Sequence, residues 1–211
     1  MNSTNLDFES FFTGQLVAKF RLPGVYVDRL NLRLDEVINR GEQIFVNQYL
    51  AGKIKAEIHA LDLLDEDLLA YFYHVARAYL GAVKTFAGKL DIERINISSC
   101  WFNDQREKEY NPVHTHRGES PIGINTVLFL KVPDNFGQEF VVDEEWPTNG
   151  HLHLLVNRGG MFSRNNQRVK PVVGDLWMFP YDLQHTVYPF FGEGVRRSLS
   201  YNCDVYLTKL V

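Results

Sequence analysis

The sequence predicts a mainly β protein with N-terminal helices, built as an antiparallel sandwich or jelly roll. Helical patterns are confined to the first ninety or so of the 211 residues. From Ile92 onward, short runs rich in β-branched and aromatic residues alternate with turn residues. No helix follows any of these runs to form the crossover of a parallel sheet, so we expect the strands to pair antiparallel.

Two helices are expected in the N-terminal region. The first is capped by Asp28 and ends at Gly41. The second, over residues 66–87, is predicted by apolar side chains that recur at three-and-four spacing and form one wide stripe. Asp65 is its expected N-cap and Gly88 its expected C-cap. An apolar stripe must pack against another layer, so we expect the helices to cover the outside of the β structure.

The predicted strands occupy most of the second half of the chain. They are Ile92–Asn103, Ile124–Val132, Glu139–Val142, His151–Val156, Gly174–Pro180 and Arg196–Leu207. No linker rich in Ser or Pro separates them from the helices. We therefore expect one domain of residues 1–211, in which 1–90 is a largely helical support layer and 91–211 is the β core.

Composition excludes several classes of protein. The formal net charge of −4 and the pI near 6.0 are too mild to indicate binding to nucleic acid or to an anionic membrane. The two cysteines, Cys100 and Cys203, lie in apolar runs and are expected to be buried free thiols. Residues 1–12 carry acids and lack the apolar run of a signal peptide, so cytoplasmic residence is the expectation.

Three of the seven histidines form the predicted metal site. His114 and His116 form an H-x-H pair, and residues i and i+2 of an extended strand point to the same face. His185 follows an apolar strand that Pro180 ends, a position from which a third, distant ligand can come. Two close ligands and one distant ligand leave open positions on a metal ion for chemistry.

A second H-x-H pair, His151 and His153, is the main rival for the metal. Its alternation with leucines is typical of a half-buried strand. We interpret the two histidines as the polar face of an edge strand, although spacing alone does not separate this pair from the first.

The last predicted strand carries an unusual polar face. Arg196, Ser198, Ser200 and Asn202 share one face by strand parity, and Arg197 lies on the other with apolar residues. We interpret the polar face as the wall of a pocket in which Arg196 and Ser198 bind a carboxylate. A strand face turned to solvent is the alternative.

The order of these motifs resembles that of the 2-oxoglutarate/Fe(II)-dependent oxygenase superfamily. The chain is most similar to its small uncharacterised branch of bacterial and phage members, described as "putative 2OG-Fe(II) oxygenase". The likeness covers roughly Trp101 to Asn202. It rests on Trp101-Phe-Asn103, Pro112-Val-His-Thr-His116, Gly174-Asp-Leu-Trp-Met-Phe-Pro180, His185 and Arg196-Arg-Ser-Leu-Ser-Tyr-Asn202.

The resemblance implies a double-stranded β-helix (a jelly roll of the cupin type) with Fe(II) at its open end. It implies an oxygenase that hydroxylates a small-molecule or protein substrate and converts 2-oxoglutarate to succinate and CO2. By motif position, His114, His116 and His185 would bind the metal. Arg196 and Ser198 would hold 2-oxoglutarate, and Asn103 is a further candidate for that role.

The chain departs from the family at one ligand. Most members have a carboxylate where this chain has His116, and a set of three neutral imidazoles leaves the metal complex one charge more positive. Three-histidine sites also occur in cupin dioxygenases that use no 2-oxoglutarate, in which Arg196 would bind the substrate instead. A non-catalytic jelly-roll binding module is the remaining alternative.

A basic segment precedes the strand that leads to His185. Residues 157–170 contain Arg158, Arg164, Arg168 and Lys170 and no acid, whereas the preceding stretch from Glu139 to Glu145 is acid-rich. The two segments are either solvated loops that neutralise each other or, in the sharper interpretation, a basic loop that helps to bind an anionic substrate.

Overall fold

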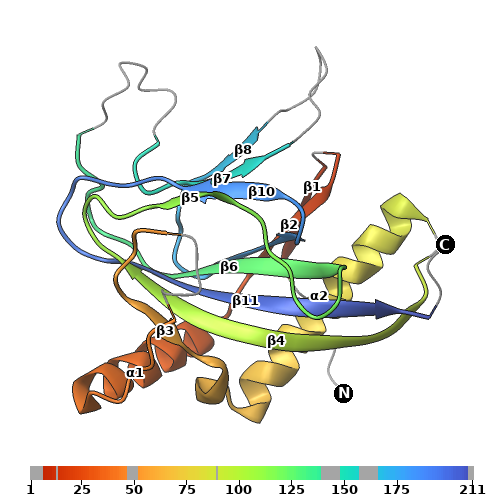
Figure 1. Cartoon of the computed structure of the whole chain (residues 1–211), viewed down its shortest axis with the longest axis horizontal. Coiled ribbons are helices and arrows are strands. Elements are labelled where there is room, and N and C mark those ends of the chain that lie inside the picture. The colour runs from red at the N-terminus through yellow and green to blue at the C-terminus, as the bar shows by residue number, and fades with distance from the viewer. Residues whose placement is uncertain are drawn as a thin grey trace.

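The computed structural model describes residues 7–12, 14–46, 52–88, 90–138, 148–156 and 166–208. Two β-sheets face each other, and the helices lie on the outer side of the larger sheet (Figure 1). The larger sheet has seven strands in the order β1-β2-β9-β6-β11-β4-β3, and the smaller has four in the order β5-β10-β7-β8. Every strand pair among the described residues is antiparallel, which confirms the predicted jelly roll.

The strands are β1 (Phe8–Phe12), β2 (Leu16–Arg21), β3 (Glu57–His59), β4 (Ile92–Gln105), β5 (Asn111–His114), β6 (Gly123–Lys131), β7 (Leu152–Leu155), β8 (Asn166–Val169), β9 (Asp175–Pro180), β10 (Gln184–Val187) and β11 (Arg196–Leu207). The helices are α1 (Gly24–Arg40), α2 (Glu66–Ala87) and the short 3-10 helix η2 (Leu61–Leu63). No described helix combines enough length and hydropathy to span a bilayer.

Helix α2 follows the prediction at both ends. The Asp65 carboxylate accepts a hydrogen bond from the backbone N–H of Leu68 (2.8 Å), and Gly88 is the C-cap. Helix α1 ends at Gly41 as expected, in the left-handed conformation that glycine adopts most readily (φ 69°).

The predicted N-cap of α1, Asp28, is wrong. The helix begins at Gly24, and its N-cap is Pro23, five residues before Asp28. The carbonyl of Pro23 accepts hydrogen bonds from Tyr26 and Val27, so the first turn forms without a side-chain cap. Proline is favoured where a helix starts because it has no N–H that must be satisfied.

The prediction of a largely helical layer in residues 1–90 omitted three strands. β1, β2 and β3 from this region join the larger sheet. In β2, Leu16, Ala18 and Phe20 face the helices while Val17 is buried between the sheets. A strand buried on both faces lacks the alternation that marks a strand in sequence.

The other strand predictions agree with the structure within a few residues. The structure also has a strand, β8, in a segment that the sequence assigned to a loop. The predicted strand Glu139–Val142 lies outside the described residues. Cys100 and Cys203 are free and buried, as expected.

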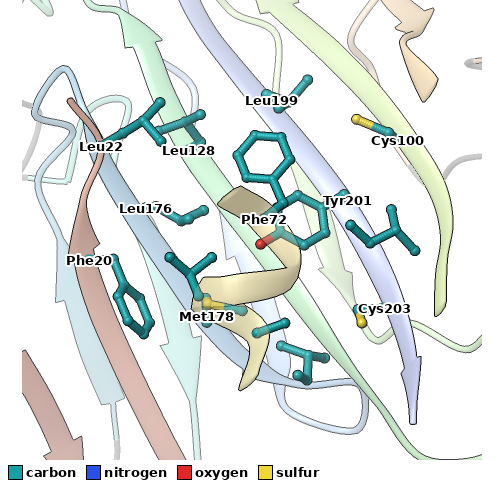
Figure 2. Packing of buried hydrophobic residues seen from close by; sticks show 14 of the residues in the cluster. Phe20, Leu22, Phe72, Cys100, Leu128, Leu176, Met178, Leu199, Tyr201 and Cys203 are labelled. Carbon is teal, nitrogen blue, oxygen red and sulfur yellow. The ribbon is translucent and has the colours of Figure 1, made fainter. Parts of the chain in front are cut away.

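The larger sheet separates two apolar cores. The outer core packs α1 and α2 on the sheet, and Figure 2 shows Phe72 of α2 against Tyr201 of β11. The two rings stack with centroids 4.8 Å apart. The inner core lies between the sheets and includes Phe129, Phe179 and Leu154. This inner core leaves one end of the space between the sheets to polar residues.

Replacing Phe72 by Ala should lower the free energy of unfolding by ~3–5 kcal/mol, because it opens a cavity where α2 packs on β11. Phe86 lies on the same helix but is 59% exposed. Phe86→Ala should change the stability by about 0.5 kcal/mol or less. Urea denaturation of both variants tests this, and equal losses would show that α2 does not pack as described.

Candidate functional site

A cavity of about 350 Å³ opens between the two sheets. Its walls come from β3, β4, β6 and β11 of the larger sheet, from β5 and β10 of the smaller sheet, and from the segment after β5. The side chains that line it are largely polar, in contrast to the apolar core beside it. A concave site with a few convergent polar groups is the usual form of a ligand pocket.

Three histidines meet in this cavity. His114 ends β5 and lies directly opposite His185 of the antiparallel neighbour β10. His116 follows two residues later, and its backbone N–H donates to the carbonyl of Tyr181 (2.9 Å). One ring nitrogen of each histidine lies within 4.8 Å of the other two, and the Nε2 atoms of His116 and His185 are 3.2 Å apart.

Backbone carbonyls orient two of the rings. His114 Nδ1 lies 2.7 Å from the carbonyl oxygen of Pro112, and His185 Nδ1 lies 3.0 Å from that of Leu183. A carbonyl can only accept, so each Nδ1 carries the hydrogen and each Nε2 keeps a lone pair. The same arrangement is typical of histidines that bind metals.

Burial keeps the three imidazoles neutral. It lowers the pKa of His114, lowers that of His116 to about 3, and lowers that of His185 well below its usual value. Neutral imidazole is the form that binds a metal ion. The cluster therefore presents ligand-competent nitrogens at neutral pH.

Aromatic packing holds the ring of His116. It lies nearly parallel to the indole of Trp101, with centroids 5.7 Å apart, and to the ring of His185, at 5.0 Å. Phe179 packs edge-on against His185 at 4.8 Å. These contacts restrict ring rotation, so the site is organised by packing as well as by hydrogen bonds.

Arg196 is a buried cation that pairs with no carboxylate of the described residues. It is 1% exposed and lines the cavity. Its Nη1 donates to Gln105 Oε1 (3.2 Å), and its guanidinium carbon lies 4.9 Å from the centroid of Phe129. Its Nε and Nη2 have no hydrogen-bond partner, and it takes part in none of the ion pairs of the described residues. Burial lowers the pKa of Arg196 to about 9, so it stays charged at neutral pH.

The two faces of β11 divide as strand parity predicted. Arg196, Ser198, Ser200 and Asn202 all line the cavity. Arg197 points to the helix side, where Nε and Nη2 donate to the two oxygens of Asp104 at 2.6 and 2.7 Å and Nη1 donates to Asp35 at 2.7 Å. The alternative that the polar face of β11 is turned to solvent is excluded, because the residues of that polar face are buried.

Asn103 lines the cavity, but its side chain has partners within the protein. When the amide is oriented to satisfy both neighbours, its nitrogen donates to Glu57 Oε1 (3.1 Å) and its oxygen accepts from the indole N–H of Trp101 (3.3 Å). The predicted role of Asn103 in holding a co-substrate gains no support from this geometry and stays a prediction.

Glu57 is a cavity residue that the sequence analysis missed. It is 1% exposed, and burial, followed by the charge of Glu109, raises its pKa to about 7. No motif surrounds it, and the three-residue strand β3 that carries it is too short to recognise from periodicity. Only its register opposite Asn103 of β4 brings it to the cavity.

The rival pair, His151 and His153, does not join this cavity. The predicted edge strand is wrong, because β7 lies between β10 and β8. Edge position depends on which distant segments pair, which local alternation does not report. The ring of His153 packs on Tyr188, with centroids 4.2 Å apart.

The basic and acidic segments fall largely outside the described residues. Arg158, Arg164 and the stretch from Glu139 to Glu145 are among those not described. Arg168 lies in β8 opposite His153. The hypothesis of a basic loop that binds an anion therefore stays a prediction.

Comparison with known proteins agrees with this geometry. Residues 99–202 match the model of the family described as "Putative 2OG-Fe(II) oxygenase". No curated protein matches the chain. Several solved structures share its fold at low sequence identity.

Three of these structures illustrate the likeness. A prolyl-4-hydroxylase from Pseudomonas putida has 16% identity and a TM-score of 0.53, over 97% of this chain and 95% of that one. The 2-oxoglutarate complex of a viral collagen prolyl hydroxylase from Paramecium bursaria Chlorella virus-1 has 11% identity and a TM-score of 0.54, over 93% and 94%. HygX from Streptomyces hygroscopicus, with nickel and 2-oxoglutarate bound, has 11% identity and a TM-score of 0.53, over 98% and 84%.

The residues of the cavity fit the two groups that this family uses. Three neutral imidazoles are suitable ligands for Fe(II), and an unpaired buried guanidinium suits a carboxylate of 2-oxoglutarate. Residues 99–202 thus match the 2OG-Fe(II) oxygenases, oxidoreductases that use Fe(II) and 2-oxoglutarate, and the histidine cluster agrees with this match.

Proposed function

We propose that this enzyme hydroxylates a C–H bond of a small-molecule or protein substrate. We assign His114, His116 and His185 as the iron ligands and Arg196 with Ser198 as the clamp for 2-oxoglutarate. One observation carries the proposal: the unpaired guanidinium of Arg196 faces the same cavity as the three convergent imidazoles.

The bound cofactors supply an oxidation in which 2-oxoglutarate and O2 become succinate and CO2, and one oxygen atom enters the substrate as a hydroxyl group. The chain's own residues bind and orient. Arg196 offers two free N–H donors to the distal carboxylate, and Ser198 adds a hydroxyl on the same strand face. Phe129 of the neighbouring apolar core packs on Arg196, and an apolar surrounding strengthens an ion pair.

The histidine at position 116 distinguishes this site from one with a carboxylate ligand. Three neutral ligands leave the charge of Fe(II) uncompensated by the protein. The anionic 2-oxoglutarate then supplies the negative charge, so we expect its affinity to depend strongly on the metal. Trp101 keeps the His116 ring parallel to that of His185 and so supports its assignment as a ligand.

His116 also favours a second candidate function. A dioxygenase with three histidine ligands that uses no 2-oxoglutarate would have the same metal site. In that enzyme, Arg196 would bind a carboxylate of the substrate itself. Release of succinate from 2-oxoglutarate by the Fe(II) protein separates the two functions, because only the oxygenase proposed first produces it.

Replacing His185 by Ala should abolish stoichiometric Fe(II) binding, because it removes the ligand that links β10 to the metal. His151→Ala is the matched control and should bind one Fe(II) per chain, since His151 lies outside the cavity lining. Elemental analysis after gel filtration measures both. Full occupancy in His185→Ala would remove this residue from the ligand set.

His116→Asp should keep Fe(II) binding, because a carboxylate is also a good ligand for this ion. The extra negative charge should shift the electronic spectrum of the metal and weaken 2-oxoglutarate binding. An unchanged spectrum together with unchanged 2-oxoglutarate affinity would show that His116 does not contact the metal.

Arg196→Met should weaken 2-oxoglutarate binding about tenfold to more than a hundredfold, the effect of losing ~1.5–3 kcal/mol in a charge-assisted bond. It should leave the protein without ligands as stable or more stable, because an apolar side chain of similar size replaces a buried unpaired charge.

Arg197→Ala should show the opposite pattern. It should lower stability by ~3–5 kcal/mol, because Asp104 loses its buried partner, while the folded fraction keeps its 2-oxoglutarate affinity. Calorimetry and denaturation of the pair test both statements. Loss of 2-oxoglutarate binding in Arg197→Ala alone would reverse the assignment of the two arginines.

A further inference from the structure

The cavity is lined by a buried acidic residue, Glu57, as well as by the buried basic residue Arg196. Glu57 is the only carboxylate among the described residues that line it. In the register of the larger sheet, Glu57 lies opposite Asn103, and Asn103 lies opposite Ser198. Two strand spacings, about 10 Å, therefore separate Glu57 from the side that carries the proposed clamp.

Glu57 lacks a positive partner within the described chain. Its Oε1 accepts a hydrogen bond from Asn103 (3.1 Å), and it takes part in none of the ion pairs described. Arg117 also lines the cavity, but it is exposed and lies beyond the 4.0 Å ion-pair distance from Glu57. A buried carboxylate without a cation is unfavourable as an anion, which agrees with its raised pKa.

The neighbouring acid does not relieve this charge. Glu109 accepts from the backbone N–H of Arg106 (2.9 Å) and of Lys55 (3.4 Å), which holds its carboxylate beside Glu57. Its negative charge adds to that of Glu57. A positively charged ligand at Glu57 would therefore be attracted by the negative charges of both Glu57 and Glu109.

2-Oxoglutarate does not bind at Glu57, because both of its ends are carboxylates and the Glu57 carboxylate repels them. We propose that Glu57 binds an ammonium or guanidinium group of the prime substrate and so determines the specificity of the enzyme. This inference rests on the proposed function, and it names a substrate class of opposite charge to the one that the basic segment 157–170 suggested. Glu57 lies in the cavity wall itself, which favours the cationic class.

The test uses two probes of equal length, n-butylammonium and butyrate, on the anaerobic Fe(II) protein with saturating 2-oxoglutarate. At pH 8, above the pKa of Glu57, the carboxylate is ionised. Ligand-observed NMR titration should give a dissociation constant at least tenfold lower for n-butylammonium. In Glu57→Gln, which keeps the size of the side chain and an oxygen that accepts from Asn103, that preference should disappear.

Two controls separate this inference from the proposed function. Glu57→Gln should keep the wild-type affinities for Fe(II) and 2-oxoglutarate, whereas Arg196→Met should lose 2-oxoglutarate and still prefer n-butylammonium when tested with Fe(II) alone. Equal binding of the two probes, or no saturable binding of n-butylammonium to the wild type, would overturn the inference. So would a Glu57→Gln protein that loses 2-oxoglutarate but keeps the preference, because Glu57 would then act through Asn103.

Discussion

Antiparallel pairing between β5 and β10 places His114 opposite His185, and the rest of the site is arranged around this pair. The carbonyls of Pro112 and Leu183 turn both Nε2 atoms toward the cavity. The segment after β5 then brings His116 to within 3.2 Å of His185. A shift of this pairing by one residue would point one histidine out of the site, so the metal position depends on strand register.

The larger sheet uses its two faces for different purposes. On the helix side, apolar residues join the sheet to α1 and α2, and Arg197, which pairs with Asp104 of β4, also donates to Asp35 of α1. On the cavity side, Arg196 is buried and forms no ion pair with any carboxylate of the described residues. Such a charge weakens the folded protein and strengthens a ligand complex, because the carboxylate that binds it restores the missing interaction. The same reasoning applies to Glu57, whose negative charge would be compensated by a positively charged ligand.

Local patterns were sufficient to predict α2, the strands with alternating faces and the polar face of β11. They were sufficient because capping, periodicity and parity are properties of neighbouring residues. They did not reveal β2, whose two faces are both buried, or the central place of β7, which depends on distant partners. The position of Glu57 in the cavity could not be predicted for the same reason. It follows from the pairing of β3 with β4, and no sequence motif marks it.

The central claim is that one cavity holds Fe(II) and 2-oxoglutarate together. Anaerobic titration of the Fe(II) protein with 2-oxoglutarate tests it most directly. The account predicts a metal-to-ligand charge-transfer band that saturates at one equivalent of 2-oxoglutarate per chain. A protein that binds Fe(II) fully but develops no such band at saturating 2-oxoglutarate would contradict the account.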